Sequence, residues 1–263
     1  MSAIINDYIT SIWDYRHFWI ALAKMDLRAR FRRTRIGILW VIIHPLLFTI
    51  MLGIVFKYVF NSSFLDLTVY IFSGIVLWNW IVESITYGSN IFIQSQAFIR
   101  QKRLPLFGYI VRSFIVSSIV FLISFIGMIF WYLFTGHRLG IFSAFLPFHI
   151  LLIAITILPV IAFSSVLGTI HRDYQQLVLL ILQLLWFMSP VFIDKNIFLN
   201  PGLQLWDSIN PISSMLSLIR DPLIYNSIPN LSDYFSVLIF SLFSWIFSLY
   251  LLKKYECHII YYL

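Results

Sequence analysis

Six long apolar segments alternate with polar segments along the chain. They are Ile38–Phe60, Val69–Phe92, Phe114–Phe134, Phe142–Leu167, Leu177–Ile193 and Tyr234–Leu252. About 20 helical residues cross a hydrocarbon core of ~30 Å, a length that all but one of these segments reach comfortably. The exception, Leu177–Ile193, spans only if its helix begins near Tyr174. Since backbone groups in lipid must be satisfied internally and no strand-like alternation occurs, the pattern predicts an all-α polytopic membrane protein with six transmembrane helices.

The apolar pattern also predicts how the rest of the chain is divided. Residues 1–37 form an N-terminal segment, residues 38–252 a transmembrane domain and residues 253–263 a tail. The long connection before the last span holds two apolar stretches, Leu203–Ile209 and Ile212–Ile219. Both are too short to cross a bilayer, so they predict interfacial or re-entrant helices.

Basic residues are concentrated on one predicted side of the membrane. If both termini are cytoplasmic, the inner segments hold 14 of the 18 Lys and Arg residues: Arg16, Lys24, Arg28, Arg30, Arg32, Arg33, Arg35, Arg100, Lys102, Arg103, Arg112, Arg172, Lys253 and Lys254. Lys and Arg are retained on the cytoplasmic side, so this asymmetry predicts a multi-pass protein with both termini in the cytoplasm.

Composition narrows the function classes. The chain is 60% hydrophobic and 11% charged, whereas soluble domains are about 25% charged. Its net charge of +7 could suit nucleic acid, but the basic residues flank the apolar spans, which favours membrane orientation and no nucleic-acid partner. The first apolar run begins only at Ile38 and is too long for a cleaved signal, so it predicts a signal anchor. The single Cys257 excludes an internal disulfide, and no Cys/His cluster predicts a metal site.

The segment before the first span predicts an amphipathic helix. Lys24, Arg28 and Arg32 recur every four residues and Arg35 follows, with Arg33 beside them, so they form one basic ridge. Trp19 and Leu22 fall on another side. This pattern predicts an interface helix on the inner leaflet, and the simpler alternative is a positive-inside anchor that touches anionic lipid.

The basic loop after the second span is a candidate docking site for another protein. Within Gln94–Pro105, a short helix would expose apolar residues among polar and basic ones: Gln96, Phe98, Ile99, Arg100, Lys102 and Arg103. Exposed apolar groups with a charged rim suit protein docking. An ordinary basic loop has the same composition.

Polar and aromatic residues at helical spacing mark one face of the second span. They are Trp80, Glu83, Tyr87 and Asn90, and the fifth span repeats the pattern with Gln183 and Trp186. Polar groups on one face of a membrane helix point to the bundle interior or a wet pathway. We take these six residues as candidate channel contacts. Glu83 could also carry a proton, or form a hydrogen bond at a helix contact.

Several short motifs, in their order, are similar to a known family. They are Arg30-Phe31-Arg32-Arg33-Thr34-Arg35-Ile36-Gly37-Ile38-Leu39-Trp40 with Pro45-Leu46-Leu47, then Arg172-Asp173, Ser189-Pro190, and Asn210-Pro211 followed by Arg220. The chain resembles the membrane subunit of ABC-2-type polysaccharide exporters (the type V exporter fold). It looks most like the O-antigen export permeases, and capsule and teichoic-acid export permeases are relatives.

The resemblance implies partners and a substrate. A homodimer of this chain would pair with two copies of a P-loop ATPase subunit in the bacterial inner membrane. An interface helix would cover about Tyr15–Arg35, and Gln94–Pro105 would couple to the ATPase. The family moves a glycan on an undecaprenyl carrier from cytoplasm to periplasm. This chain has no P-loop, so ATP and Mg²⁺ are expected only on the partner, with no cofactor here.

Other function classes stay open at this point. A membrane-embedded glycosyltransferase or polymerase would need acids near the membrane edge, and Asp207, Asp221 and Asp233 are candidates that turn or capping roles explain equally well. An ion-coupled carrier would use Glu83. The sequence has no G-x-S-x-G motif and no paired carboxylates in a plausible pocket, so its motifs do not favour an enzyme.

Overall fold

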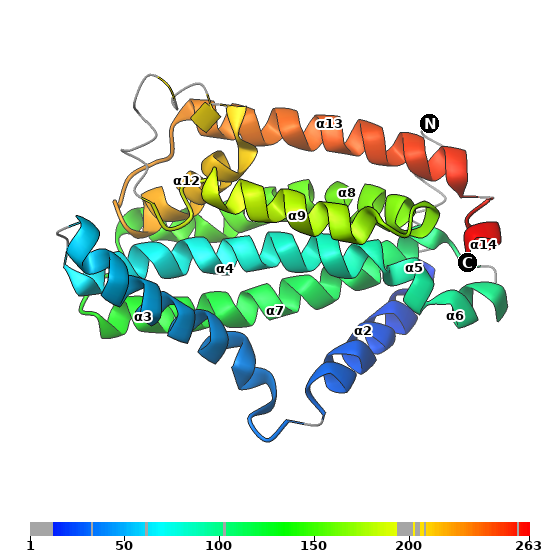
Figure 1. The fold of residues 1–263 in the computed structure, drawn as a ribbon, viewed down its shortest axis with the longest axis horizontal. Helices are drawn as coiled ribbons and strands as arrows, with labels where there is room; N and C mark the ends of the chain where they lie inside the picture. The colour runs from blue at the N-terminus through cyan, green and yellow to red at the C-terminus, as the bar shows by residue number, and fades with distance from the viewer. Residues whose placement is uncertain are drawn as a thin grey trace.

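The computed structural model describes residues 13–32, 34–60, 63–101, 104–193, 202, 206–207, 209–256 and 258–263. Every regular element within these ranges is helical, which confirms the predicted fold class (Figure 1). The elements are α2 (Arg16–Phe31), η1 (Gly37–Leu39), α3 (Trp40–Phe60), α4 (Phe64–Ser89), α5 (Ile91–Gln94), α6 (Gln96–Gln101), α7 (Leu106–Phe134), η2 (Ile141–Phe145), α8 (Leu146–Ile170), α9 (Tyr174–Phe187), α12 (Pro211–Leu223), α13 (Leu231–Tyr255) and α14 (Ile259–Tyr262).

Among the described residues, five helical segments are long and apolar enough to cross a membrane: Gly37–Val59, Phe64–Ser89, Leu106–Phe134, Ile141–Ile170 and Leu231–Tyr255. The fifth predicted span, Leu177–Ile193, has different bounds in the structure. Its helix α9 does begin at Tyr174, but it has 14 residues and ends at Phe187. Pro190 follows within a turn, as expected of a residue that cannot donate to a helical hydrogen bond.

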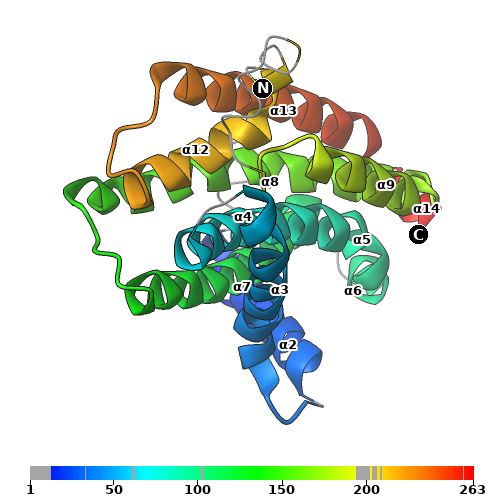
Figure 2. The same ribbon diagram turned by 60° about the vertical axis from the view of Figure 1, so that its left-hand side comes forward.

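Helix α4 is the centre of the bundle. In its most apolar 18-residue window, 78% of the residues are buried, compared with 17% in the first span. It packs against α3, α7 and α8, and α9 runs alongside it (Figures 1 and 2). The remaining helices are therefore arranged around a helix that is mostly buried.

Helix α2 is held against the start of α7. The ring of Trp19 is 1% exposed and lies edge-on to Tyr109, with 5.0 Å between the ring centroids. Gly108 makes room for it, because a Cβ atom there would lie 2.1 Å from the Trp19 ring. From this contact α2 runs outward to a turn, and α3 returns from the turn toward the bundle (Figure 1).

A buried arginine holds α12 to α4. Arg220 is 3% exposed, and its guanidinium donates to the carbonyl oxygens of Pro190 at 2.5 Å, Val191 at 2.6 Å and Tyr70 at 3.0 Å. Its Nε also donates to the Ser73 hydroxyl at 3.2 Å, and its Cζ lies 3.6 Å from the centroid of the Tyr70 ring. A charge in hydrocarbon needs such partners, so Arg220 fixes the turn after α9 between α12 and α4.

Asn210 makes a second link between α12 and the turn after α9. Its side chain caps α12 by accepting from the Ile212 backbone N–H at 3.1 Å, and it donates to the Ser189 hydroxyl at 2.8 Å. The motifs Ser189-Pro190, Asn210-Pro211 and Arg220 therefore meet in space. The 13-residue α12 is too short to cross a bilayer. Most of the other predicted re-entrant stretch, Leu203–Ile209, lies outside the described residues.

Replacement of Gly74 tests this packing. In an exposed helix, Gly→Ala is stabilising by about 1 kcal/mol. Here a Cβ would lie 2.1 Å from the Val191 carbonyl oxygen and 2.5 Å from Arg220 Nη2, so Gly74→Ala is expected to lower the melting temperature of the purified protein. The neighbouring Ser73→Ala, which removes the hydrogen bonds of the Ser73 hydroxyl to Arg220 and to the Tyr70 carbonyl without any clash, is expected to have the smaller effect. An unchanged or raised melting temperature for Gly74→Ala would contradict this account.

Candidate functional site

An ion pair joins α2 to the middle of the bundle. Arg30 of α2 contacts Glu83 of α4 through both carboxylate oxygens, and Nη2 lies 3.1 Å from Oε2. The sequence left Glu83 open as a proton carrier or as a hydrogen-bonding group at a helix contact. The structure places it in a contact between α2 and α4.

A second ion pair lies closer to the α6 end of the bundle. Arg112 of α7 donates from Nε and Nη2 to the two oxygens of Asp26 at 2.6 and 2.5 Å. Its third nitrogen donates to Ser95 Oγ, at the N-terminal end of α6, at 3.2 Å. Tyr87 of α4 lies beside the same carboxylate. Arg112 therefore connects α2, α7 and the corner between α5 and α6.

A cavity of about 270 Å³ lies next to the Arg30–Glu83 pair, between α2, α3, α4 and α7. Trp80 lines it and stacks on Phe121, with 4.0 Å between the ring centroids and 15° between their planes. The Trp80 indole N–H is buried and has no hydrogen-bond partner among the described residues. A buried donor without a partner costs free energy.

A neighbouring cavity of about 300 Å³ continues along α4 toward α9. His44, Pro45 and Asn79 line both cavities. The second cavity adds Trp78 and Trp186, which lie edge-on with ring centroids 5.2 Å apart. Together the two cavities present flat aromatic faces beside an amide, an imidazole and an ion pair.

Asn79 lines both cavities but was not among the residues predicted from the sequence. It is exposed in a stretch of α4 that is otherwise buried, from Leu67 to Ile81. The predicted contacts were chosen at the helical spacing of Trp80 and Glu83, and Asn79 does not share that spacing. The available signal was its position between Trp78 and Trp80, where an amide lies between two large aromatic side chains.

The other three predicted contacts lie away from the two cavities. Tyr87 lies by Asp26, and Asn90 donates to the Thr86 carbonyl at 3.2 Å near the α6 end. Gln183 is exposed on α9 and lines neither cavity. Of the six candidate contacts, Trp80, Glu83 and Trp186 therefore share the connected cavities, and the remaining three do not.

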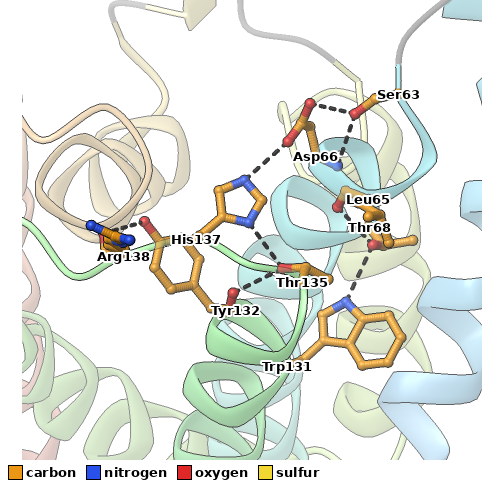
Figure 3. A network of polar contacts seen from close by, with 9 residues as sticks. All are labelled: Ser63, Leu65, Asp66, Thr68, Trp131, Tyr132, Thr135, His137 and Arg138. Carbon is orange, nitrogen blue, oxygen red and sulfur yellow. Dashed lines mark hydrogen bonds and ion pairs between the residues drawn. The ribbon is translucent and has the colours of Figure 1, made fainter.

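At the end of the bundle where α4 begins and α7 ends, polar contacts join these two helices (Figure 3). His137 Nε2 lies 2.9 Å from Asp66 Oδ1, and its Nδ1 lies 2.9 Å from the Thr135 hydroxyl. The Trp131 indole donates to Thr68 Oγ1 at 3.2 Å. These contacts hold the start of α4 against the end of α7.

The family of the chain follows from comparison with known proteins. Residues 17–224 match the ABC-2 type transporter family. The chain belongs to this family. It is 25% identical over 225 residues to an O-antigen export system permease protein RfbA of Klebsiella pneumoniae, covering 84% of this chain and 85% of that protein. It is 23% identical over 217 residues to the protein of the same name from Myxococcus xanthus, covering 80% and 81%.

In this ABC-2 permease, the predicted interface helix is α2 with the residues that follow it. Lys24, Arg28, Arg32 and Arg35 are exposed, whereas Trp19 and Leu22 are buried against the protein. The apolar side of α2 therefore packs on α7 in addition to any lipid contact. Arg33 lies outside the described residues.

The predicted coupling loop forms α6, a single short helix of the permease. Phe98 is 39% exposed and Arg100 is exposed, while Ile99 is buried. Gln96 donates to the backbone carbonyl of Leu263, beside α14. Lys102 and Arg103 lie outside the described residues.

Removal of Asp26 tests the Arg112 connection. The Arg112 side chain is 8% exposed, so Asp26→Asn leaves a nearly buried guanidinium without its counter-charge. We expect a loss of about 3 kcal/mol in stability, measured as a lower melting temperature of the purified permease. The double variant Asp26→Asn/Arg112→Met removes the stranded charge and is expected to recover part of that loss. Lys24→Met on the exposed side of α2 serves as the control, and equal effects of Asp26→Asn and Lys24→Met would contradict the assignment.

Proposed function

We propose that this permease forms the membrane path of an exporter that moves a lipid-linked polysaccharide of the O-antigen type from cytoplasm to periplasm. The observation that carries the proposal is the pair of adjoining cavities on α4, where aromatic faces lie beside hydrogen-bonding groups. Sugar rings present apolar faces and hydroxyl edges, so they need both kinds of contact. The names of the relatives in Klebsiella pneumoniae and Myxococcus xanthus support the same substrate class.

Each group in the cavities has a plausible contact with a glycan. Glu83, which is paired with Arg30, accepts from hydroxyls, and Trp80 adds an aromatic side chain to the wall. Asn79 donates and accepts at the point that the two cavities share. Trp78 and Trp186 provide stacking surface farther along. Weak, repeated contacts of this kind let a long chain move stepwise without being held.

The energy source is a separate P-loop ATPase that docks on α6. The chain has no P-loop, and α6 exposes Phe98 and Arg100 at the basic end of the bundle. Movement of α6 is transmitted to α2 in two steps. Arg112 donates a hydrogen bond to Ser95 beside α6, and it also pairs with Asp26 of α2. Because Arg30 on α2 also holds Glu83 at the first cavity, the two ion pairs link the docking helix to the proposed path. In this orientation both termini are cytoplasmic and the membrane is the bacterial inner membrane.

Two copies of the chain are expected to enclose the path, with ATP and Mg²⁺ bound only by the ATPase subunits. The first span leaves most of its surface uncovered, with 17% of its apolar window buried. On α9, Leu184 and Phe187 are also exposed. Both helices border the second cavity, through Phe48 and Trp186, so a second copy packed here would close it from lipid.

Loss of ATPase binding tests the coupling helix. Phe98→Ala and Arg100→Ala are each expected to abolish stoichiometric co-purification of a P-loop ATPase from native membranes, because they remove the exposed apolar and charged contacts of α6. Gln94→Ala, an exposed change on α5, is expected to leave the ATPase bound. A stable wild-type chain that carries no ATPase would contradict the transporter proposal itself.

Loss of export tests the cavities. Asn79→Ala, Glu83→Ala and Trp186→Ala are each expected to slow the appearance of surface polysaccharide roughly tenfold, equivalent to about 1.4 kcal/mol per contact. The readout is pulse-labelled polysaccharide at the cell surface, normalised to permease level. Phe243→Ala removes an exposed aromatic of α13 that lines neither cavity and is expected to have no effect. Wild-type export by all three cavity variants would show that the glycan takes another route.

A further inference from the structure

A separate cavity of about 340 Å³ lies along another face of α9, between that helix and α4, α8, α12 and α13. Tyr174, Val178, Leu182 and Leu185 line it from one end of α9 to the other. Their spacing of three or four residues is that of one helix face, so the cavity follows the full length of α9. Val160 of α8 belongs to the opposite wall.

The few polar groups in the wall of this cavity already have partners within the protein. Thr156 Oγ1 donates to the Leu152 carbonyl at 3.0 Å. The hydroxyls of Ser164 and Tyr174 lie 3.0 Å apart and bond to each other.

The same holds at the other end of the cavity. The Trp206 indole donates to the Met188 carbonyl at 2.5 Å, and Asn210 is bonded to Ser189 and to the backbone N–H of Ile212. An occupant therefore meets mainly hydrocarbon, because each of these polar groups already bonds within the protein. This chemistry differs from that of the cavities around Asn79, where polar groups remain available.

Position in the membrane agrees with the chemistry. The wall residues on α4, α8 and α13 include Ile81, Val160 and Phe240, each at least two turns from the ends of a helix long enough to cross the membrane. Water is a poor occupant, since an apolar cavity of about 150 Å³ stays dry and accepts benzene instead. A sugar is excluded as well, because its hydroxyls would lose their partners.

We propose that this cavity binds one acyl chain of a membrane phospholipid, which lies along α9 and completes the packing of that helix. Phospholipid chains form the hydrocarbon of the membrane that α4, α8 and α13 cross. Lipid tails are as apolar as the cavity wall, so the gain comes from van der Waals contact that an empty space would forfeit. The elongated cavity along α9 suits a linear chain. The proposal is independent of the transported substrate.

Filling the cavity tests the proposal. Val178→Phe and Val160→Phe each place a ring in the space from opposite walls, and Leu180→Phe adds the same ring on α9, where Leu180 is 59% exposed and outside the cavity. The proteins are purified in mild detergent, checked for folding by size exclusion and circular dichroism, and assayed for retained phospholipid by mass spectrometry. We expect wild type and Leu180→Phe to retain phospholipid, and the two cavity variants to lose it.

A second readout separates lipid binding from a folding defect. Added phospholipid is expected to raise the melting temperature of wild type and Leu180→Phe, and to leave Val178→Phe and Val160→Phe unchanged because their cavity is already filled. Equal phospholipid retention by all four proteins would overturn the proposal. Recovery of a polyprenyl lipid in place of phospholipid, or of no lipid from wild type, would also overturn it.

Discussion

A charged side chain at membrane depth must have a partner, and this requirement determines how the helices of this permease are joined. Arg220, Arg112 and Glu83 lie on helices of the apolar bundle, and each is paired with a group from another element. Desolvation makes an unpaired charge there very costly, so the contacts are specific. The elements they fasten are the ones that do not span. Helix α12 is held by Arg220, and α2 is held by Arg112 and Glu83.

These pairs also give the proposed transport cycle a physical connection. Arg112 contacts Ser95 beside the proposed docking helix and Asp26 on α2, and Arg30 on α2 contacts Glu83 at the first cavity. A shift of α6 is therefore transmitted through these side-chain contacts to groups that line the proposed glycan path, and it does not depend on a flexible linker. The buried central helix α4 stays in place during this movement, because it packs against α3, α7, α8 and α9.

The fold class was predictable from the sequence because membrane helices need long apolar runs. Helix ends were less certain: α7 begins at Leu106 rather than Phe114, since polar and basic residues such as Arg112 are tolerated inside the helix when paired. The partner of Glu83 was not predictable, because Arg30 is 53 positions away and does not belong to the basic ridge that the sequence predicts. The burial of Trp19 depends on the space at Gly108, which no local pattern reveals.

The central claim is that this chain conducts a lipid-linked glycan only when its ATPase partner hydrolyses ATP. The most direct measurement uses proteoliposomes that contain the permease, the co-purified ATPase and the lipid-linked glycan, with the glycan assayed on each side of the bilayer. The account predicts translocation that requires ATP and stops when either subunit is omitted. Translocation by the permease alone, or conversion of the lipid-linked sugar to a longer product without any ATPase, would contradict it.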